Sequence, residues 1–325
     1  MTPAPTGRLA SWRPSLQQQW LAALACLVTQ GLITVTGAIV RVTSSGLGCP
    51  TWPTCFPDSM TPRADALVPW QHQAIEFGNR TLTGLVSLAA ILVAVLVTLA
   101  RRKRPVLVLG WAMIGGTLAQ AVIGGITVLA GLKWWTVAIH LVASMVMIWF
   151  ATLLVARVRE PDDDLPAGRA DQRLRTSAAV SGALLALVLV AGTLVTGAGP
   201  HAGDKSTTRP VARLDVPIPE LARWHSALVL CYLVSLAALS WFARSANPPT
   251  RRAARIAAGL ALAQGALGEA QYWQGVPSLL VVLHVGGAVL VASATAFVWA
   301  RTTTRPTLRA DTAPPGVVTA AARAR

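Results

Sequence analysis

The sequence of 325 residues is divided into eight long apolar blocks separated by polar connections. Each block approaches the roughly 20 apolar residues that cross the hydrocarbon core of a bilayer. Because hydrocarbon offers no water to backbone N–H and C=O groups, such crossing segments are helical. Charged residues make up only 13% of the chain, against about 25% in an ordinary soluble domain. The pattern predicts an all-α integral membrane protein with eight transmembrane helices over Trp20–Val42, Ala74–Ala100, Val106–Ala130, Trp134–Ala156, Ser177–Ala198, Leu221–Phe242, Ile256–Tyr272 and Val276–Ala300.

Most of the 28 Lys and Arg residues lie in alternate connections between these blocks, and the formal net charge is +15. Such a charge can indicate nucleic-acid binding, but here the positive residues flank membrane segments, so we expect the lipid bilayer and no nucleic acid as a partner. Positive connections stay in the cytoplasm, which predicts that both termini are cytoplasmic. The first block is long enough to span the bilayer and is expected to be retained rather than cleaved as a signal. The positive clusters lie within 8–13, 101–104, 157–175, 244–255 and 301–325.

Short internal matches divide the chain into two halves. The segment Leu118–Gly125 resembles Leu262–Glu269 at an offset of 144 residues (262 − 118), which also carries His140 onto His284. The segment Val35–Ala38 recurs as Val195–Ala198. Four helices per repeat is an even number, so we expect two pseudo-symmetric four-helix bundles arranged as parallel repeats. The expected divisions are an N-terminal half over 1–158, a charged cytoplasmic linker over 159–175, a C-terminal half over 176–300 and a disordered tail over 301–325.

Three histidines are placed inside helices and toward the predicted outer side of the membrane. His140 lies six residues from the outer Trp134, roughly 9 Å into its helix. His225 and His284 lie at similar depth in alternate helices, and imidazoles on facing helices commonly hold haem iron. We therefore predict that His225 and His284 bind haem, although a lone histidine is more often a hydrogen-bonded structural residue. Zinc and copper are disfavoured because no further ligand of a suitable type converges on the pair.

Arginines at the outer helix ends support this prediction. Arg41, Arg80 and Arg223 lie on the same side as the histidines. A haem carries two propionates, and the planar guanidinium of arginine suits carboxylates. For Arg80 and Arg223 we favour propionate pairing, and the alternative is that their stems lie along apolar surface at the membrane interface.

Glu76 is the acidic residue of most interest inside a predicted helix. It precedes Asn79 by three residues and Arg80 by four, so the three share one helix face. An ionisable group there can move protons or stabilise charge during oxidation of a nearby carbon. It can equally serve only as the ion-pair partner of Arg80, and the two alternatives are even. Glu269 is a weaker candidate.

Two of the four cysteines lie in the first predicted external loop. Cys49 and Cys55 are in a compartment that permits oxidation, which favours a disulfide between them over two free thiols. Cys26 and Cys231 lie inside predicted helices, where cysteine behaves as a small hydrophobe.

The segments Gly37–Cys55 and Ile75–Arg80 resemble the first helix, external loop and second helix of the haem A synthase family, and the loop Gly-Cys-Pro-x-Trp-Pro-x-Cys is the most specific part of the resemblance. The resemblance implies oxidation of the C8 methyl of haem O to the formyl group of haem A, for cytochrome c oxidase assembly in a bacterial cell membrane. It implies haem b as an electron-transfer cofactor held by His225 and His284, with Arg223. It implies that His140, Asn79, Arg80 and Arg41 surround the substrate haem, with Glu76 as the catalytic residue. Haem O synthase is the expected upstream partner, and a homo-oligomer is possible.

One departure from the family concerns Asn79, because many members have histidine there. We expect His140 alone to ligate the substrate haem, unless His72 compensates from further out. Two rival functions remain at this stage. The first is a di-haem cytochrome that transfers electrons, with quinol as donor, and the second is a transporter in which Glu76 and Glu269 bind coupling ions.

Overall fold

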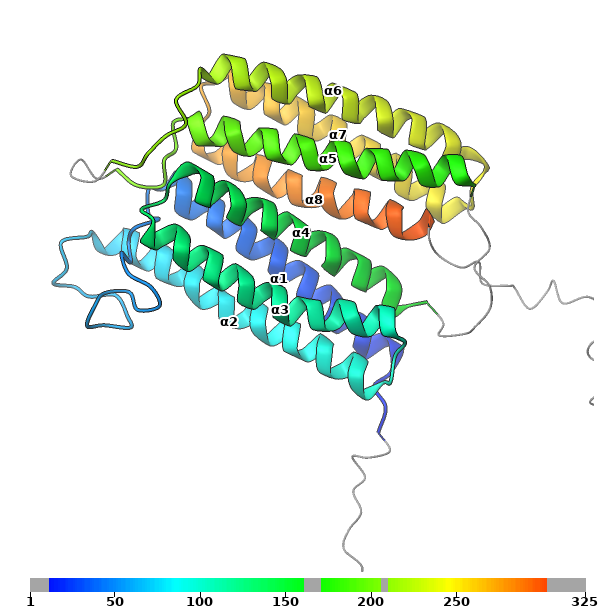
Figure 1. The fold of residues 1–325 in the computed structure, drawn as a ribbon, viewed down its shortest axis with the longest axis horizontal. Coiled ribbons are helices and arrows are strands. Elements are labelled where there is room, and N and C mark those ends of the chain that lie inside the picture. The colour runs from blue at the N-terminus through cyan, green and yellow to red at the C-terminus, as the bar shows by residue number, and fades with distance from the viewer. Residues whose placement is uncertain (1–11, 161–170, 206–209, 303–325) are drawn as a thin grey trace, which may run out of the picture.

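The structure, a computed structural model, describes residues 12–160, 171–205 and 210–302. These residues form eight long α-helices and one short 3-10 helix, and no named strand is among them. The helices run alternately up and down, as the hydrophobic blocks predict (Figure 1). Their bounds are α1 Leu16–Val42, α2 Trp70–Leu99, α3 Arg104–Leu129, α4 Trp134–Val158, α5 Gln172–Ala198, α6 Ile218–Phe242, α7 Pro248–Trp273 and α8 Ser278–Thr302, with η2 at Ala243–Ser245.

The helices form two groups of four, α1 to α4 and α5 to α8, that lie side by side (Figure 1). The groups meet where α4 packs against α5 and α8, and where α1 packs against α8. One apolar core lies within the first group and another within the second, and α4 contributes Met147 and Ala151 to the first and Met145 and Ile148 to the second. The two described chain ends lie at the same end of the bundle (Figure 1).

Seven of the eight helices are long and apolar enough to cross a membrane. Large apolar side chains point outward around the bundle, for example Leu88, Leu118 and Leu230, which are 62%, 62% and 63% exposed. Such outward-facing side chains are favourable against lipid tails and unfavourable against water. The exception is α7, whose sequence is the least apolar of the eight.

Several helix boundaries differ from the predicted ones, because apolar content alone does not mark a helix end. His72 was expected to precede a helix but lies inside α2, which begins directly after Pro69. Helix α7 begins eight residues before the predicted Ile256, where the side chain of Asn247 accepts a hydrogen bond from the Thr250 N–H at 2.9 Å. The predicted start at Val276 was wrong: Val276 has a φ of 61° and is followed by proline, so α8 begins at Ser278.

Helices α5 and α8 extend into the segments that were predicted as linker and tail. Asp171 caps α5 by accepting the Arg173 N–H at 3.0 Å, so the helix already begins at Gln172 within the expected linker. At the other end, Arg301 and Thr302 belong to α8. The rest of the expected tail, and residues 161–170 of the linker, lie outside the described residues.

The connection between α1 and α2 is the longest loop among the described residues, and it covers one end of the first helix group (Figure 1). Its beginning is attached to the second half, since Gly46 N–H donates to the Gly203 carbonyl at 2.8 Å. Gly48 lies directly on the start of α2, where a Cβ would stand 2.2 Å from the His72 carbonyl oxygen, so only glycine allows this approach. The loop is therefore held to both halves of the molecule.

Candidate functional site

A cavity of about 790 Å³ lies inside the second helix group. It is within the range of roughly 300–1,000 Å³ that is typical of cofactor and ligand sites. His225 of α6 and His284 of α8 both line it, together with the mostly apolar side chains of α4, α5 and α7. The two histidines that were predicted to form a pair therefore face a common space.

The histidine rings lie close to the backbone of the neighbouring helix at a glycine. A Cβ at Gly192 of α5 would stand 3.2 Å from Cε1 of His225, and one at Gly268 of α7 would stand 3.1 Å from Cε1 of His284. His140 of α4 has the same arrangement, with a Cβ at Gly124 of α3 only 3.3 Å from its Cε1. A larger residue at these glycines would push the ring, so the glycines fix where each imidazole stands.

The Nδ1 atoms of His140, His225 and His284 are all buried and have no hydrogen-bond partner. Buried polar atoms without a partner are uncommon and costly in proteins, and three of one kind call for an explanation. The rings of these histidines are therefore positioned by packing rather than by a hydrogen bond at Nδ1, and their role as iron ligands stays a prediction.

A glutamine supports the backbone of two of the histidine helices in the same way. Gln120 Nε2 donates to the His140 carbonyl at 3.3 Å and to Ser144 Oγ at 2.5 Å. Gln264 Nε2 donates to the His284 carbonyl at 2.7 Å. The internal sequence match had paired Gln120 with Gln264 and Gly124 with Gly268, so these contacts are what the repeated motif encodes.

Two arginines line the cavity of the second helix group, and one of them was expected at the substrate site instead. Arg223 lines it as predicted. Arg41 was expected near the first-half histidine, yet its side chain reaches from α1 into the lining of the second-half cavity, where its Nη2 donates to the Thr196 carbonyl at 3.0 Å. The cause is tertiary, because α1 packs against α8 and brings its last turn beside the end of α5.

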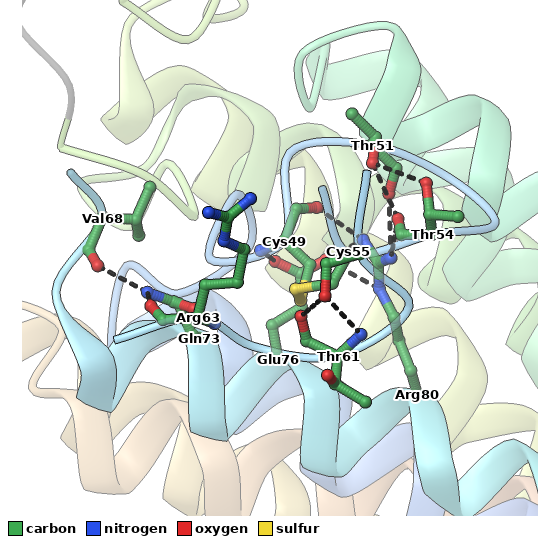
Figure 2. Close-up of a disulfide and its surroundings, with 11 residues drawn as sticks. Cys49, Thr51, Thr54, Cys55, Thr61, Arg63, Val68, Gln73, Glu76 and Arg80 are labelled. Carbon is green, nitrogen blue, oxygen red and sulfur yellow. Dashed lines mark hydrogen bonds and ion pairs between the residues drawn. A yellow bond between two sulfur atoms is a disulfide. The ribbon is translucent and has the colours of Figure 1, made fainter. Parts of the chain in front are cut away.

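Arg80 and Glu76 attach the first loop to α2 (Figure 2). Glu76 is 4% exposed, and its Oε2 accepts the Cys49 N–H at 2.7 Å. Its Oε1 accepts from Arg80 Nε at 3.1 Å and Nη2 at 2.5 Å. Arg80 also donates to the carbonyls of Cys49, Thr51 and Thr54 at 2.6, 2.8 and 3.2 Å.

These bonds have two consequences for the sequence predictions. The ion pair between Glu76 and Arg80 is present, and it holds the loop closed by the disulfide Cys49–Cys55, which the structure also contains. All the donors of Arg80 point to Glu76 or to loop carbonyls, so this side chain is engaged with the protein itself. A proton-transfer role for Glu76 stays a prediction.

In the first helix group, His140 is the one histidine predicted to ligate haem, and Asn79 stands where many family members have another. Asn79 of α2 faces α1, where its Oδ1 accepts from Thr36 Oγ1 at 2.6 Å. Trp52 of the loop packs flat on α3, since a Cβ at Gly125 would stand 2.4 Å from its Cδ2. Gly125 adjoins Gly124, which faces His140, so one turn of α3 contacts the loop through one glycine and the histidine through the other. His72 is bonded through Nδ1 to Ser45 Oγ at 2.9 Å, and its compensation for Asn79 as a ligand stays a prediction.

The residues that line the cavity of the second helix group fit a haem. Two imidazoles with unpaired ring nitrogens line a largely apolar space of suitable volume, and Arg41 and Arg223 supply positive charge for the propionates. Among the described residues no group of three His, Cys, Asp or Glu forms a candidate metal site.

Comparison with known sequences gives the family. The family described as cytochrome oxidase assembly protein (COX15-CtaA) matches residues 18–296. The chain belongs to this family. Because seven of its helices are apolar enough to span a membrane, it is a multi-pass membrane protein.

Individual relatives match over shorter stretches. A protein named Heme A synthase from Lysinibacillus sphaericus (strain C3-41) is 35% identical over 153 residues, which are 44% of this chain and 46% of that protein. Another of that name, from Geobacillus thermodenitrificans, is 31% identical over 104 residues, 31% of each chain. The matched stretches thus span less than half the length of these relatives.

Sequence reasoning identified the histidines, the disulfide and the Glu76–Arg80 pair, but it missed two sets of residues. The three glycines that face the histidine rings went unnoticed, although two of them lie in the repeated motif. The contact of Trp52 with Gly125 was also missed, and it had no local signal, since it joins a loop to a helix some 70 residues away (125 − 52 = 73).

Proposed function

We propose that this protein is a haem A synthase, which oxidises the C8 methyl of haem O to the formyl group of haem A for cytochrome c oxidase. Family membership and the relatives named Heme A synthase support this proposal. The observation that carries it is the difference between the two halves. The second half has two histidines on one cavity, whereas the first has the single histidine His140 on α4, and Asn79 of α2 bonds to Thr36.

The second half is proposed to hold a resident haem b through His225 and His284, with Arg223 near a propionate. When bound, that haem supplies one-electron transfer. The protein's part is to fix both imidazoles against Gly192 and Gly268 and to surround them with apolar side chains. A low-polarity setting with two fixed imidazoles suits an electron carrier, since neither ligand has to leave.

The first half is proposed to bind haem O as substrate, with His140 as its only protein ligand and the opposite face toward Asn79. An amide oxygen is a weak iron donor, so that face is left for water or an oxidant. Glu76 is proposed to accept or donate a proton near the reacting methyl. Arg80 and the loop are proposed to exclude bulk water from this position. Trp52 fixes the same loop against α3 at Gly125.

We also propose a placement in the membrane. All eight helices, including α7, span the bacterial cell membrane as two parallel four-helix repeats, and both termini are cytoplasmic. The recurrent Gln–histidine and glycine–histidine contacts of the two halves support the repeat, and the positive clusters at the end of the bundle that carries both chain ends support the orientation. Helix α7 has the length of its neighbours and packs between α6 and α8.

Co-expression with haem O synthase in a host that lacks haem A tests the activity. Pigment extraction is expected to yield haem A or its hydroxylated precursor, and the yield is expected to fall by at least about tenfold in Glu76→Ala. A folded protein that holds haem but makes neither product would point to the di-haem cytochrome. A protein without a Soret band would contradict both haem functions and favour the transporter.

The ligation of the substrate is tested separately by spectroscopy of protein loaded with haem O. We expect a high-spin or water-ligated signal from the first half, alongside a low-spin bis-imidazole signal that disappears in His284→Ala. A second bis-imidazole signal, lost in His140→Ala, would overturn the proposed single ligation.

A further inference from the structure

Arg41 stands at the outer end of the second-half cavity, although it belongs to the first helix group. Its Nη2 donates to the Thr196 carbonyl in the last turn of α5. That carbonyl has no helical partner, because the residue four positions on is Pro200, which lacks an N–H. This carbonyl, which belongs to the second helix group and has no backbone donor, therefore holds the side chain of Arg41 in place.

A second arginine converges on the same oxygen. Arg213, in the loop before α6, donates from Nη2 to the Thr196 carbonyl at 3.4 Å. Burial lowers the pKa of Arg213, as expected for a guanidinium that loses water without gaining a carboxylate. Within the described residues neither Arg41 nor Arg213 forms an ion pair. Two positive groups thus share one neutral oxygen.

No carboxylate among the described residues neutralises these two arginines, and Arg41 lines the cavity. The Nε of Arg41 is buried and has no hydrogen-bond partner, while the residue lines the same cavity as His225 and His284. Buried charges in proteins are ordinarily paired, so an anion is the missing component. The cavity is otherwise mostly apolar, which suits an anion that is one end of a large apolar ring.

We propose that Arg41, with Arg213 behind it, binds a propionate carboxylate of the haem held by His225 and His284. This inference rests on the proposed second-half haem and changes the sequence-based expectation that Arg41 serves the substrate haem. Arg223 lines the same cavity and is available to the other propionate. The first half then contributes an anchoring residue to the cofactor of the second half, so neither half completes that site alone.

Release of haem to apomyoglobin tests the proposal in purified full-length protein. Arg41→Gln is expected to release the second-half haem roughly tenfold faster than wild type, since a charge-assisted hydrogen bond is lost. Its midpoint potential is expected to become more negative, because removing a positive charge favours the ferric form. Arg41→Lys should restore most of the potential. Arg63→Gln serves as the matched control, because Arg63 is an external-loop arginine paired with Asp58 and Asp65, away from the cavity.

Haem dimethyl ester distinguishes anion binding from a structural role of Arg41 between α1 and α5. Wild-type protein should retain the free acid better than the ester, and Arg41→Gln should lose most of that preference. Equal release and potential in wild type and Arg41→Gln would overturn the assignment while the second-half haem stands. A preference for the free acid that is unchanged in Arg41→Gln would also overturn it. A wild-type protein with no haem dependent on His225 and His284 would overturn both this inference and the proposed function.

Discussion

Each candidate haem-ligating histidine is positioned by a residue without a side chain. Gly124, Gly192 and Gly268 stand on the neighbouring helix at the level of an imidazole. Small residues let transmembrane helices approach closely, and here the space gained is filled by the ring rather than by a second backbone. The direction of the imidazole is therefore set by helix packing and not by a hydrogen bond to Nδ1.

Replacing Gly268 tests whether this glycine positions the ring of His284. Gly268→Ala places a methyl group 3.1 Å from Cε1 of His284, so the ring must rotate or shift by a few tenths of an ångström. Overpacking of this kind costs about 1–3 kcal/mol. We expect an altered low-spin EPR signal and haem retention reduced by roughly tenfold.

Gly259→Ala provides the matched control on the same helix. The added methyl group would have no heavy atom of another helix within 4 Å, and Gly259 is not among the residues that line the cavity. An unchanged spectrum in Gly268→Ala, or equal changes in both variants, would show that the glycine does not position the histidine.

At the scale of elements, one face of α2 holds the external loop. Gln73, Glu76 and Arg80 follow one another at helical spacing and all bond to loop backbone. The carbonyl of Val68 accepts from Gln73 Nε2 at 2.7 Å, and the disulfide closes the other part of the loop (Figure 2). The loop is thus an ordered cover, fixed mainly by buried and charged donors.

Breaking this attachment should expose the disulfide. Arg80→Gln removes the charged donor to three loop carbonyls and leaves the buried Glu76 carboxylate without its partner. Cys49 and Cys55 are 0% and 1% exposed, so access to them requires loop movement. We expect reduction by a mild thiol, followed by maleimide labelling, to be at least about tenfold faster than in wild type.

Arg63→Gln is the control for this experiment. Arg63 lies in the same loop but pairs with the exposed Asp58 and Asp65, and exposed ion pairs contribute about 0–1 kcal/mol. If Arg80→Gln labels no faster than Arg63→Gln, the attachment through α2 does not hold the loop.

For the whole molecule, the two halves are joined through packing as well as through the chain. Helix α4 packs into both cores, α1 and α4 pack against α8, and Gly46 bonds to Gly203 between the external loops. The boundary expected after residue 158 divides the sequence, but the packing crosses it. A haem in the second cavity contacts the α4 side chains Leu141 and Met145 if it fills the space they line.

Removal of the second-half haem is therefore expected to destabilise the entire protein. A ligand present at about 1,000 times its Kd stabilises the folded state by roughly 4 kcal/mol. The variant His225→Ala/His284→Ala should unfold at a lower temperature than wild type, in one transition for both halves.

Asn79→Ala is the matched control, because Asn79 faces α1 in the other helix group. It should keep the wild-type unfolding temperature to within a few degrees. Two separate transitions in the histidine variant, with the first half unaffected, would contradict coupling of the halves.

The sequence by itself determined the helices and the disulfide-bonded cysteines of the loop, while the two-fold repetition and the common depth of the histidines stay predictions. These features are local or periodic: a bilayer demands about 20 apolar residues per helix, and a repeat places equivalent side chains at a fixed offset. Helix ends were less certain, since capping residues such as Asn247 and polar first turns decide them.

Only the tertiary structure decided which side chains meet across elements. Arg41 reaches the second half because α1 packs against α8, and Arg80 is engaged by loop carbonyls that no spacing rule brings to it. Trp52 of the loop meets Gly125 of α3 for the same reason. Helix packing and loop closure bring residues that are distant in sequence within a few ångströms, and such contacts leave no local pattern to read.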